Sequence, residues 1–489
     1  MPPGEIVDFL SGRDVKGTPP ADECLIPYDL WGSQANVLML CRQGILSRQE
    51  GKKILKGLRA IAALHRKGRF RLDPSKEDVH SNIESFLIQT IGIEAGGKVH
   101  TGRSRNDQIA LDMRLYLRDQ VFAFVAGLID LIEVLFKRAE EERLTLMPGY
   151  THHQRAMATT LGHLLLSFAE ALERDVQRFI HWVCLFNKNP LGAAAGYGTS
   201  FNLDRHLTSR LLGFDGPTEN VTDPITQRWE AEAEVAYDVA ILMDHLSTMA
   251  QTLILLSTGE FNMIRLHDRH CSGSSIMPQK RNPDTLEVIK AKTSLAQGVV
   301  TSFLSMGKAL FMGYNRDTQW TKYWIMDLVE ETVPALPVMA DIFRLLEVNQ
   351  DQMAREAQSE FVGATSLMEW MVRSCGVPLR RAKRIMERAV RYSEEEGAAE
   401  VTYRSLQKVL REEKVEIPVT PTAVKQVQQP REILAHARSV GMASEKRVKE
   451  HLASLRIRMK KARHWLDQER KGMEKAKELV LRMERTIGL

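Results

Sequence analysis

The sequence predicts an all-α protein whose middle part consists of long helices. Apolar residues recur there at alternating steps of three and four positions, over residues 111–136, 161–183 and 235–256. Such stripes, sustained for four or more turns, are typical of long helices packed in a bundle. No run of alternating β-branched residues is long enough to predict a sheet.

We predict three domains, because 489 residues exceed what one simple core accommodates. Residues 1–105 are expected to form short helices joined by loops. Residues 106–350 are expected to form the long-helix bundle. Residues 351–489 return to short helices and end in an extended basic helix beyond Met442.

Two more long helices are expected in the bundle, over residues 284–310 and 321–347. The second should bend at Pro334 and Pro337, since each proline lacks a backbone N–H. A single up-and-down bundle would leave apolar faces exposed. Either the terminal domains cover these faces or the central helices of several copies associate, and we favour association.

Composition excludes several classes of protein. Hydrophobic residues make up 44% of the chain and charged residues 26%, which is ordinary for a globular protein. Apolar runs such as residues 161–168 are interrupted by polar residues, so we expect no membrane span. The acidic N-terminal stretch shows no basic-then-apolar leader pattern, so we expect no export signal. The five scattered cysteines contain no CxxC pair, which argues against a disulfide framework or zinc knuckle and favours the cytoplasm.

Positive charge is concentrated at the C-terminus. Residues 444–489 carry 14 Lys and Arg against 7 Asp and Glu, whereas the whole chain has a net charge of +5. No known nucleic-acid-binding signature accompanies this tail, so we expect no nucleic-acid partner. A helix with a solvated face of mixed charge explains the composition better.

Residues 273–284, GSSIMPQKRNPD, separate two helical stretches, and we interpret them as a lid over an anionic substrate. Small residues make the approach mobile, while Pro278 and Pro283 fix the exit into the next helix. Lys280 and Asn282 can then face a bound anion. An ordinary polar connector would explain the glycine and the prolines, but not this Lys-x-Asn pair.

A second segment, residues 98–108 with the sequence KVHTGRSRNDQ, precedes the first long helix. Its Ser104, Arg105 and Asn106 offer hydrogen-bond donors near a helix N-terminus. Such an arrangement favours a carboxylate site. Ordinary helix capping is the alternative.

A third segment, residues 149–156 with the sequence GYTHHQRA, is expected to open the second long helix. It supplies Thr151 as a donor and His152, whose imidazole exchanges protons near neutral pH. His152 and His153 could also suggest a metal, but no nearby carboxylate or cysteine completes a ligand set. We therefore predict that activity needs no metal and no organic cofactor.

The three segments, in this order and spacing, resemble the signature regions of the argininosuccinate lyase family, within the fumarase/aspartase superfamily. The resemblance runs roughly over residues 18–442 and includes EDVH at 77–80, YNRD at 314–317 and GVP at 376–378. It implies a three-domain fold with a long central bundle. It also implies a homotetramer in which each active site draws one signature region from each of three subunits.

The resemblance implies cleavage of the C–N bond in an N-substituted aspartate, with release of fumarate and an amine. The groups that would hold the succinyl carboxylates are Ser104, Arg105, Asn106, Thr151, Lys280 and Asn282. Ser274 would remove the proton with its alkoxide stabilised by Lys280. His152, oriented by Glu287, would protonate the leaving nitrogen. Which of Ser274 and His152 is the base and which the acid stays open.

Further positions match the part of the family's site that holds the leaving group. They are Tyr314, Gln319, Lys322 and Arg228. Thr18 and Asp22 stand where the family has a serine followed four residues later by an aspartate. They are placed by counting back from Gly32-Ser33.

The chain departs from the family near this leaving-group pocket. Residues 226–230 are TQRWE where the family has Ser-x-Arg-Asp-Phe, and Trp320 and Thr321 replace acidic residues. Trp229 and Trp320 either line the pocket, which would alter specificity, or belong to the core. We favour the core.

Four functions compete, and the weakest is a nucleic-acid-binding role for the basic tail. The first is cleavage of argininosuccinate to arginine and fumarate. The second is a sister lyase that releases fumarate from a different N-substituted aspartate. The third is a catalytically idle structural relative, such as the lens crystallins of this family. The presence of Ser274, His152 and Glu287 argues against it.

Overall fold

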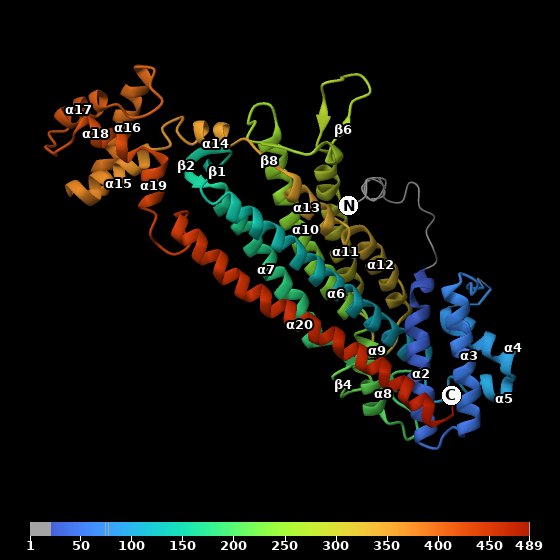
Figure 1. The fold of residues 1–489 in the computed structure, drawn as a ribbon. Coiled ribbons are helices and arrows are strands. Elements are labelled where there is room, and N and C mark those ends of the chain that lie inside the picture. The colour runs from blue at the N-terminus through green and yellow to red at the C-terminus, as the bar shows by residue number, and fades with distance from the viewer. Residues whose placement is uncertain (1–20, 74, 77, 489) are drawn as a thin grey trace.

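The structure is a computed structural model that describes residues 21–73, 75–76 and 78–488. A long helical bundle occupies its middle, with a smaller group of helices at either end (Figure 1). The first group comprises η1 (Ala21–Leu25), α2 (Ile26–Arg42), α3 (Arg48–Arg66), α4 (Val79–Ile91) and α5 (Ile93–Gly96). The long helices of the middle part are α6 (Arg105–Glu141), α7 (Leu161–Phe186), α10 (Glu230–Ser257), α11 (Asp284–Gly307), α12 (Thr321–Thr332) and α13 (Ala335–Leu345). They confirm the predicted all-α fold class.

Shorter elements connect the long helices. They are α8 (Arg205–Leu212), α9 (Asp223–Thr226), η2 (Asp268–His270), η3 (Arg316–Gln319) and the two-residue strand pairs β3 (Lys188–Asn189) with β4 (Gly216–Pro217), β5 (Ile264–Arg265) with β8 (Glu347–Val348), and β6 (Ser272–Gly273) with β7 (Arg281–Asn282). The predicted bend is present, because α12 ends just before Pro334 and α13 begins just after it. Pro337 lies in the first turn of α13, where its missing N–H is tolerated.

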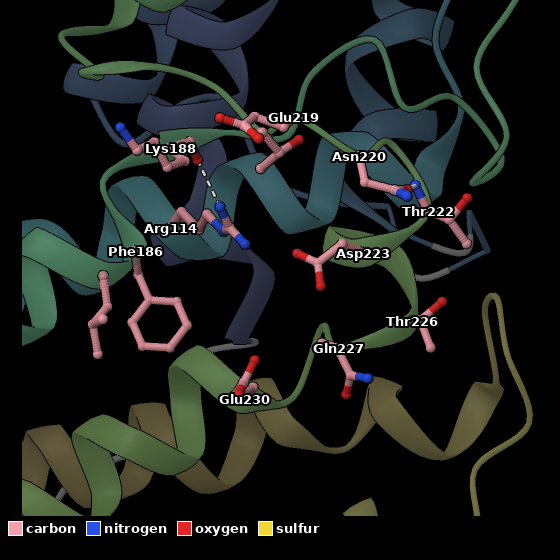
Figure 2. A pocket seen from close by; sticks show the side chains of 12 residues that line it. Arg114, Phe186, Lys188, Glu219, Asn220, Thr222, Asp223, Thr226, Gln227 and Glu230 are labelled. Atoms are coloured by element: carbon pink, nitrogen blue, oxygen red, sulfur yellow. Dashed lines mark hydrogen bonds between the residues drawn. The ribbon is translucent and has the colours of Figure 1, made fainter.

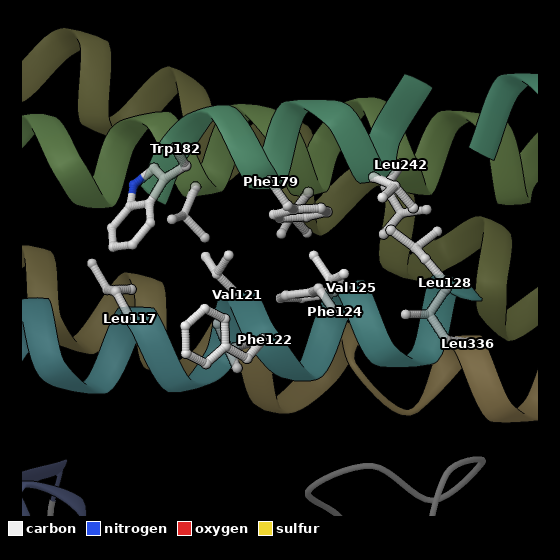
Figure 3. Close-up of a cluster of buried hydrophobic side chains, with 14 of the residues drawn as sticks. Leu117, Val121, Phe122, Phe124, Val125, Leu128, Phe179, Trp182, Leu242 and Leu336 are labelled. Atoms are coloured by element: carbon white, nitrogen blue, oxygen red, sulfur yellow. The ribbon is translucent and has the colours of Figure 1, made fainter. Parts of the chain in front are cut away.

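Aromatic and branched side chains from different helices fill the core of the bundle (Figure 3). Phe124 of α6 stacks on Phe179 of α7, with ring centroids 4.9 Å apart. Trp182 is fully buried, and its indole N–H donates to the carbonyl oxygen of Ala231 at 2.9 Å. Buried aromatic pairs of this kind contribute large apolar areas. The packed helices therefore form a rigid support for residues at both ends of the bundle.

One hairpin interrupts the helical pattern between α6 and α7. β1 (Leu146–Thr151) and β2 (Gln154–Thr160) pair antiparallel. The expectation that residues 149–156 open the second long helix is therefore wrong, because α7 begins only at Leu161. Pro148 cannot donate a helical hydrogen bond, and a chain that turns at residues 152–153 pairs with itself instead.

The C-terminal part has a hydrophobic core of its own. Its short helices are α14 (Gln350–Glu356), α15 (Ala364–Cys375), α16 (Leu379–Glu395), α17 (Tyr403–Glu412), α18 (Pro421–Val427) and α19 (Pro430–Ala435). Buried side chains from Leu367 to Val424 form this core. The last helix, α20 (Glu445–Thr486), instead packs along α6, α7 and α8, as Figure 1 shows. Its apolar side joins the main core, so the basic tail is an amphipathic helix laid on the bundle. The domain boundaries at 105 and 350 stay a prediction.

Within the described residues, α10 alone is long and apolar enough to cross a membrane by length and composition. The interrupted apolar runs of the sequence did not suggest such a helix. Half of its most apolar window is buried inside the protein, where α10 packs against α11 and α7. A core helix of a bundle has the same composition, so this property is weak evidence for a membrane span.

Candidate active site

A cavity of about 210 Å³ lies at the N-terminal end of α6. The residues that line it are Asp22, Asp78, His80, Arg105, Asn106, Ile109, Arg228, Tyr314, Arg316, Gln319 and Lys322. Seven of these were predicted from the sequence. They come from η1, from the start of α6, from the turn before α10, and from the segment that runs from Tyr314 through η3 into α12. We call this region the binding end.

The N-terminus of α6 presents donors to this cavity. Ser104 caps the helix, since its hydroxyl accepts from the N–H of Asn106 at 3.3 Å and its N–H donates to Asp107 at 2.9 Å. Arg105 is held by Asp78 at 3.3 Å and donates to the hydroxyl of Ser81 at 2.5 Å. Unsatisfied N–H groups and the positive end of the helix dipole both favour a bound carboxylate.

Two cationic side chains from other segments complete the cavity. The ammonium group of Lys322 forms an ion pair with Asp22, and both side chains are largely buried. Asp22 also accepts from the backbone N–H of Val79 at 3.1 Å. Arg228 is buried, with its guanidinium 5.4 Å from the ring centroid of Tyr314. Burial lowers the pKa of Arg228. Thr18, the remaining predicted residue of this group, lies outside the described residues.

Strands β1 and β2, whose connecting turn contains His152, lie at the opposite end of the bundle (Figure 1). His152 and His153 form the turn of the hairpin with φ values of 52° and 60°. A two-residue turn with both φ values positive is a type I′ turn, which usually contains glycine or asparagine. Thr151 and His152 are exposed there. A strained turn that displays an imidazole favours a functional role for that side chain.

The lid segment, residues 273–284, lies at the same end as the hairpin (Figure 1). Strands β6 and β7 pair across its base, so that Ser272 lies opposite Asn282. The hydroxyl of Ser274 accepts from the N–H groups of Ile276 at 3.3 Å and Met277 at 3.1 Å. These donors would also stabilise an alkoxide at Ser274. We call the hairpin turn and this segment together the hairpin end.

Other predicted residues of the hairpin end are exposed and separate. Lys280 is exposed in the lid segment, and Glu287 is exposed in the first turn of α11. Among the described residues, no hydrogen bond joins Glu287 to His152. The predicted orientation of His152 by Glu287 is thus not formed within one chain.

The length of α6 separates the two ends. Its 37 residues span about 55 Å at 1.5 Å per residue, from Arg105 to Glu141, and the hairpin follows directly. A substrate of a few carbon atoms cannot contact Arg105 and His152 of the same chain. One chain therefore contains the parts of a site but does not bring them together.

Comparison with known proteins identifies the family of this chain. Residues 21–298 match the family model described as lyase, and residues 361–435 match the model of the argininosuccinate lyase C-terminal region. An argininosuccinate lyase of Hahella chejuensis is 43% identical over 76% of this chain and 78% of that protein. One of Halorhodospira halophila is 43% identical over 79% of this chain and 83% of that protein. The chain belongs to the argininosuccinate lyase family.

Solved structures extend this comparison to the whole fold. The structure of an EDDS lyase in complex with formate is similar to this member of the argininosuccinate lyase family, with a TM-score of 0.90 and 28% identity. The match covers 99% of this chain and 95% of the EDDS lyase. A class II fumarase from Schistosoma mansoni matches with a TM-score of 0.71 and 16% identity over 89% of this chain and 95% of the fumarase, which shows a shared fold alone.

The tryptophans by which this chain departs from the family pattern do not line the cavity. Trp320 is 55% exposed and contacts Tyr323 edge to face, so the expected core role is wrong for Trp320 within one chain. Trp229 is half-buried and packs against Gly307 of α11, where an added Cβ would lie 2.4 Å from the ring. The acidic residues of the family are nevertheless missing at both positions.

A larger cavity, of about 730 Å³, lies beside the turn from α9 to α10 (Figure 2). None of the predicted site residues lines it. Arg114, whose guanidinium reaches toward it, already donates to the carbonyl oxygen of Lys188 at 2.7 Å. We therefore place the candidate site of this family member at the smaller cavity.

Sequence reasoning missed the residues that support the predicted ones. Asp78, His80 and Ser81 form the first turn of α4, and two of them hold Arg105. The EDVH motif contains two of the three and was noted only as part of the resemblance. A cap followed by a histidine beside an arginine-rich segment was the available signal. Arg316, in η3, belongs to the YNRD segment, which was likewise noted only as part of the resemblance.

Proposed function

We propose that this protein cleaves argininosuccinate to arginine and fumarate, a reaction of arginine biosynthesis. The observation that carries the proposal is the cavity at the N-terminus of α6, in which Arg105, Asn106 and Lys322 converge. The curated relatives with 43% identity name the same reaction. The lyase family acts on dicarboxylates, and carboxylates are the groups that this cavity suits.

The reaction begins with removal of a weakly acidic proton from the carbon next to a carboxylate. Charge then develops on that carboxylate, and donors fixed in advance stabilise it. Arg105 and the N–H groups of α6 provide such donors, while Lys280 of the lid segment adds a positive charge. The electron pair from the broken C–H bond forms the double bond of fumarate as the C–N bond breaks. Ser274 and His152 are the proton acceptor and donor, in an order left open.

We propose a homotetramer in which each active site combines three chains. The separation of about 55 Å along α6 supports this assembly, because the binding residues and the acid–base residues of one chain are too far apart to contact the same substrate. Large apolar side chains on α10 and α11 also face solvent, among them Tyr237 at 49% and Leu304 at 64% exposure. Association of these helices would bury them.

We place this enzyme in the cytoplasm. The five cysteines are all free thiols in the structure, as a reducing compartment favours. The family is one of soluble enzymes, and the prediction that neither a metal nor an organic cofactor is needed remains a prediction. Exhaustive EDTA treatment tests it, because restoration of activity by a divalent ion would contradict it.

The decisive experiment incubates the purified protein with argininosuccinate and follows the absorbance of fumarate. A second candidate is a sister lyase for another N-substituted aspartate. Two observations favour it: the EDDS lyase similarity over 99% of the chain, and the tryptophans that replace acidic residues. If argininosuccinate is inert while another N-substituted aspartate releases fumarate, the sister activity replaces the first proposal.

A further inference from the structure

A buried cluster of two carboxyl groups and one imidazole adjoins the binding end. Asp29 of α2, His80 of α4 and Asp112 of α6 are each at most 2% exposed. Nδ1 of His80 lies 2.5 Å from Oδ2 of Asp29 and 3.8 Å from Oδ2 of Asp112. His80 also lines the cavity that contains Arg105. The proposed reaction assigns no role to these three groups.

The two carboxyl groups have unequal surroundings. Asp29 accepts from the hydroxyl of Ser33 at 3.2 Å and from the amide of Gln108 at 3.4 Å, in addition to its contact with His80. Oδ2 of Asp112 is buried and has no hydrogen-bond partner in the described part of the chain. Two adjacent buried carboxylates repel each other, so one of them retains its proton.

The pKa directions agree with this geometry. Burial and the negative charge of Asp29 raise the pKa of Asp112 well above its usual value. Burial alone would raise the pKa of Asp29, but the attraction of His80 outweighs it and lowers that pKa. The other charged or titratable groups that act on the pair are Arg103, His100, Asp22 and Asp78. The proton that one of the two carboxyl groups retains therefore resides on Asp112, and Asp29 carries the negative charge.

The cluster holds the turn on which the cavity depends. His80 belongs to the first turn of α4, whose cap Asp78 and neighbour Ser81 both contact Arg105. The N–H of Val79 in the same turn holds Asp22, the partner of Lys322. A shift of His80 would thus displace the supports of both cations.

We propose that Asp29, His80 and Asp112 form a buried clamp that keeps one proton on Asp112 and a negative charge on Asp29, and that positions Arg105 and Lys322 for the substrate's carboxylates. The three are positioning residues. The role in substrate binding rests on the proposed function, whereas the protonation of Asp112 is independent of it. The three side chains could by spacing hold a cation. Arg103, which donates to Ser33 at 3.1 Å and so lies next to Asp29, places a positive charge there and disfavours it.

The first test measures thermal unfolding of the intact protein from pH 5 to pH 8 and needs no substrate. The raised pKa of Asp112 means that the folded chain binds the proton more tightly than the unfolded chain, so its ionisation costs stability as pH rises. Asp112→Asn removes this cost, and its melting temperature should rise relative to that of the native protein as pH increases. Asp29→Asn should lower the melting temperature across this range. The pKa of Asp29 is lower in the folded than in the unfolded chain, so its carboxylate stabilises the fold at pH values above the unfolded-state pKa. Asp130→Asn is the control, because Asp130 is an exposed carboxyl on α6, the helix of Asp112. It should change neither the melting temperature nor its dependence on pH.

The second test separates positioning from a structural role. Asp29→Asn and His80→Gln should raise KM for argininosuccinate at least tenfold with kcat within about threefold, whereas Asp112→Asn, whose amide imitates the protonated carboxyl group, should raise KM by less than Asp29→Asn does. The KM of the native enzyme should also rise at alkaline pH, and that of Asp112→Asn should not. If argininosuccinate proves inert, the affinity for fumarate measured by calorimetry replaces KM.

Several outcomes would overturn the clamp. Equal losses in Asp29→Asn and Asp112→Asn would remove the asymmetry on which it rests. A lower melting temperature with unchanged KM in the folded variants would make the cluster merely structural. Stabilisation of the native protein by micromolar Zn²⁺, lost in His80→Gln, would show a cation site instead. Should Asp29→Asn fail to fold, the KM and melting temperature of His80→Gln and Asp112→Asn still test the clamp.

Discussion

The two ends of the bundle contain different kinds of site residues. At the binding end, Lys322 and Arg228 are at most 7% exposed, and Lys322 is ion-paired with Asp22. At the hairpin end, His152 is exposed on a turn, and Ser274 is half-buried in the lid segment. One end is fixed by contacts within the chain, and the other is displayed to solvent.

This difference indicates how stability and activity are divided in the molecule. Removing one member of a buried ion pair leaves an uncompensated charge and destabilises the fold. Substituting an exposed side chain costs almost nothing in stability. Variants at the binding end should therefore affect folding and binding together, while variants at the hairpin end should affect the reaction alone.

The largest effect is expected for His152→Asn. Loss of a positioned acid–base group typically reduces the rate by about 10²–10⁴-fold, and we expect a value near the upper limit. The melting temperature should stay within about 2 °C of the native value, because surface substitutions of this kind change stability by no more than about 0.5 kcal/mol. Fumarate release and calorimetry measure the two quantities. A large stability loss would show that the hairpin end is structural.

Mixing His152→Asn with Ser274→Ala subunits sharpens the same comparison. If each site takes His152 and Ser274 from different chains, random reassociation should restore about one quarter of the sites. Sites formed within one chain could not recover in this way. Proven mixed tetramers without any recovered activity would contradict the shared site.

A smaller effect, confined to the binding end, is expected for Lys322→Met. The carboxylate of Asp22 would stay largely buried without its cation, at a cost of about 3–5 kcal/mol in the free energy of unfolding. Adding Asp22→Asn should recover most of this loss. Lys137→Met is the control, because Lys137 is 79% exposed in its contact with Glu141 and such pairs contribute little. Denaturant unfolding measures all three variants.

The sequence predicted the long helices of this molecule well and their ends poorly. Apolar stripes at steps of three and four identify helices over residues 111–136 and 235–256, because burial on one face imposes that period. The hairpin was missed, since the period carries no information about where a helix begins. The stripe in residues 161–183 was right, but the start expected for that helix was not.

The candidate site was predicted only in part, for a physical reason. Residue types and spacing single out donors such as Arg105, and seven of the predicted residues line one cavity in the structure. Supporting groups such as Asp78 and His80 depend on the packing of α4 against α5, α3 and α2, which the local pattern of a cap and a histidine does not contain. Trp320 was assigned to the core because the other leaving-group residues are present, but its position before α12 leaves it exposed within one chain.

A third buried carboxyl group, that of Glu232, is expected to make the stability of the fold depend on pH. Glu232, in the first turn of α10, is 1% exposed and its Oε2 has no hydrogen-bond partner among the described residues. Burial raises its pKa to about 7, although Arg228 and Arg114 act in the opposite direction. Because the folded chain holds this proton more tightly than the unfolded chain, the stability it contributes falls as pH rises from about 5 to about 7.

The smallest effect is therefore expected for Glu232→Gln, and only at higher pH. The amide cannot ionise, so the variant should match the native protein near pH 5 and exceed its stability at pH 8, by at most about 3 kcal/mol at 1.36 kcal/mol per pKa unit. Glu234→Gln, two residues along the same helix and only partly buried, should show no such divergence. Calorimetric melting temperatures at both pH values measure the difference. If Glu232→Gln is instead less stable at every pH, the carboxylate is charged and paired with Arg228 in the folded enzyme, and the binding end depends on one more ion pair.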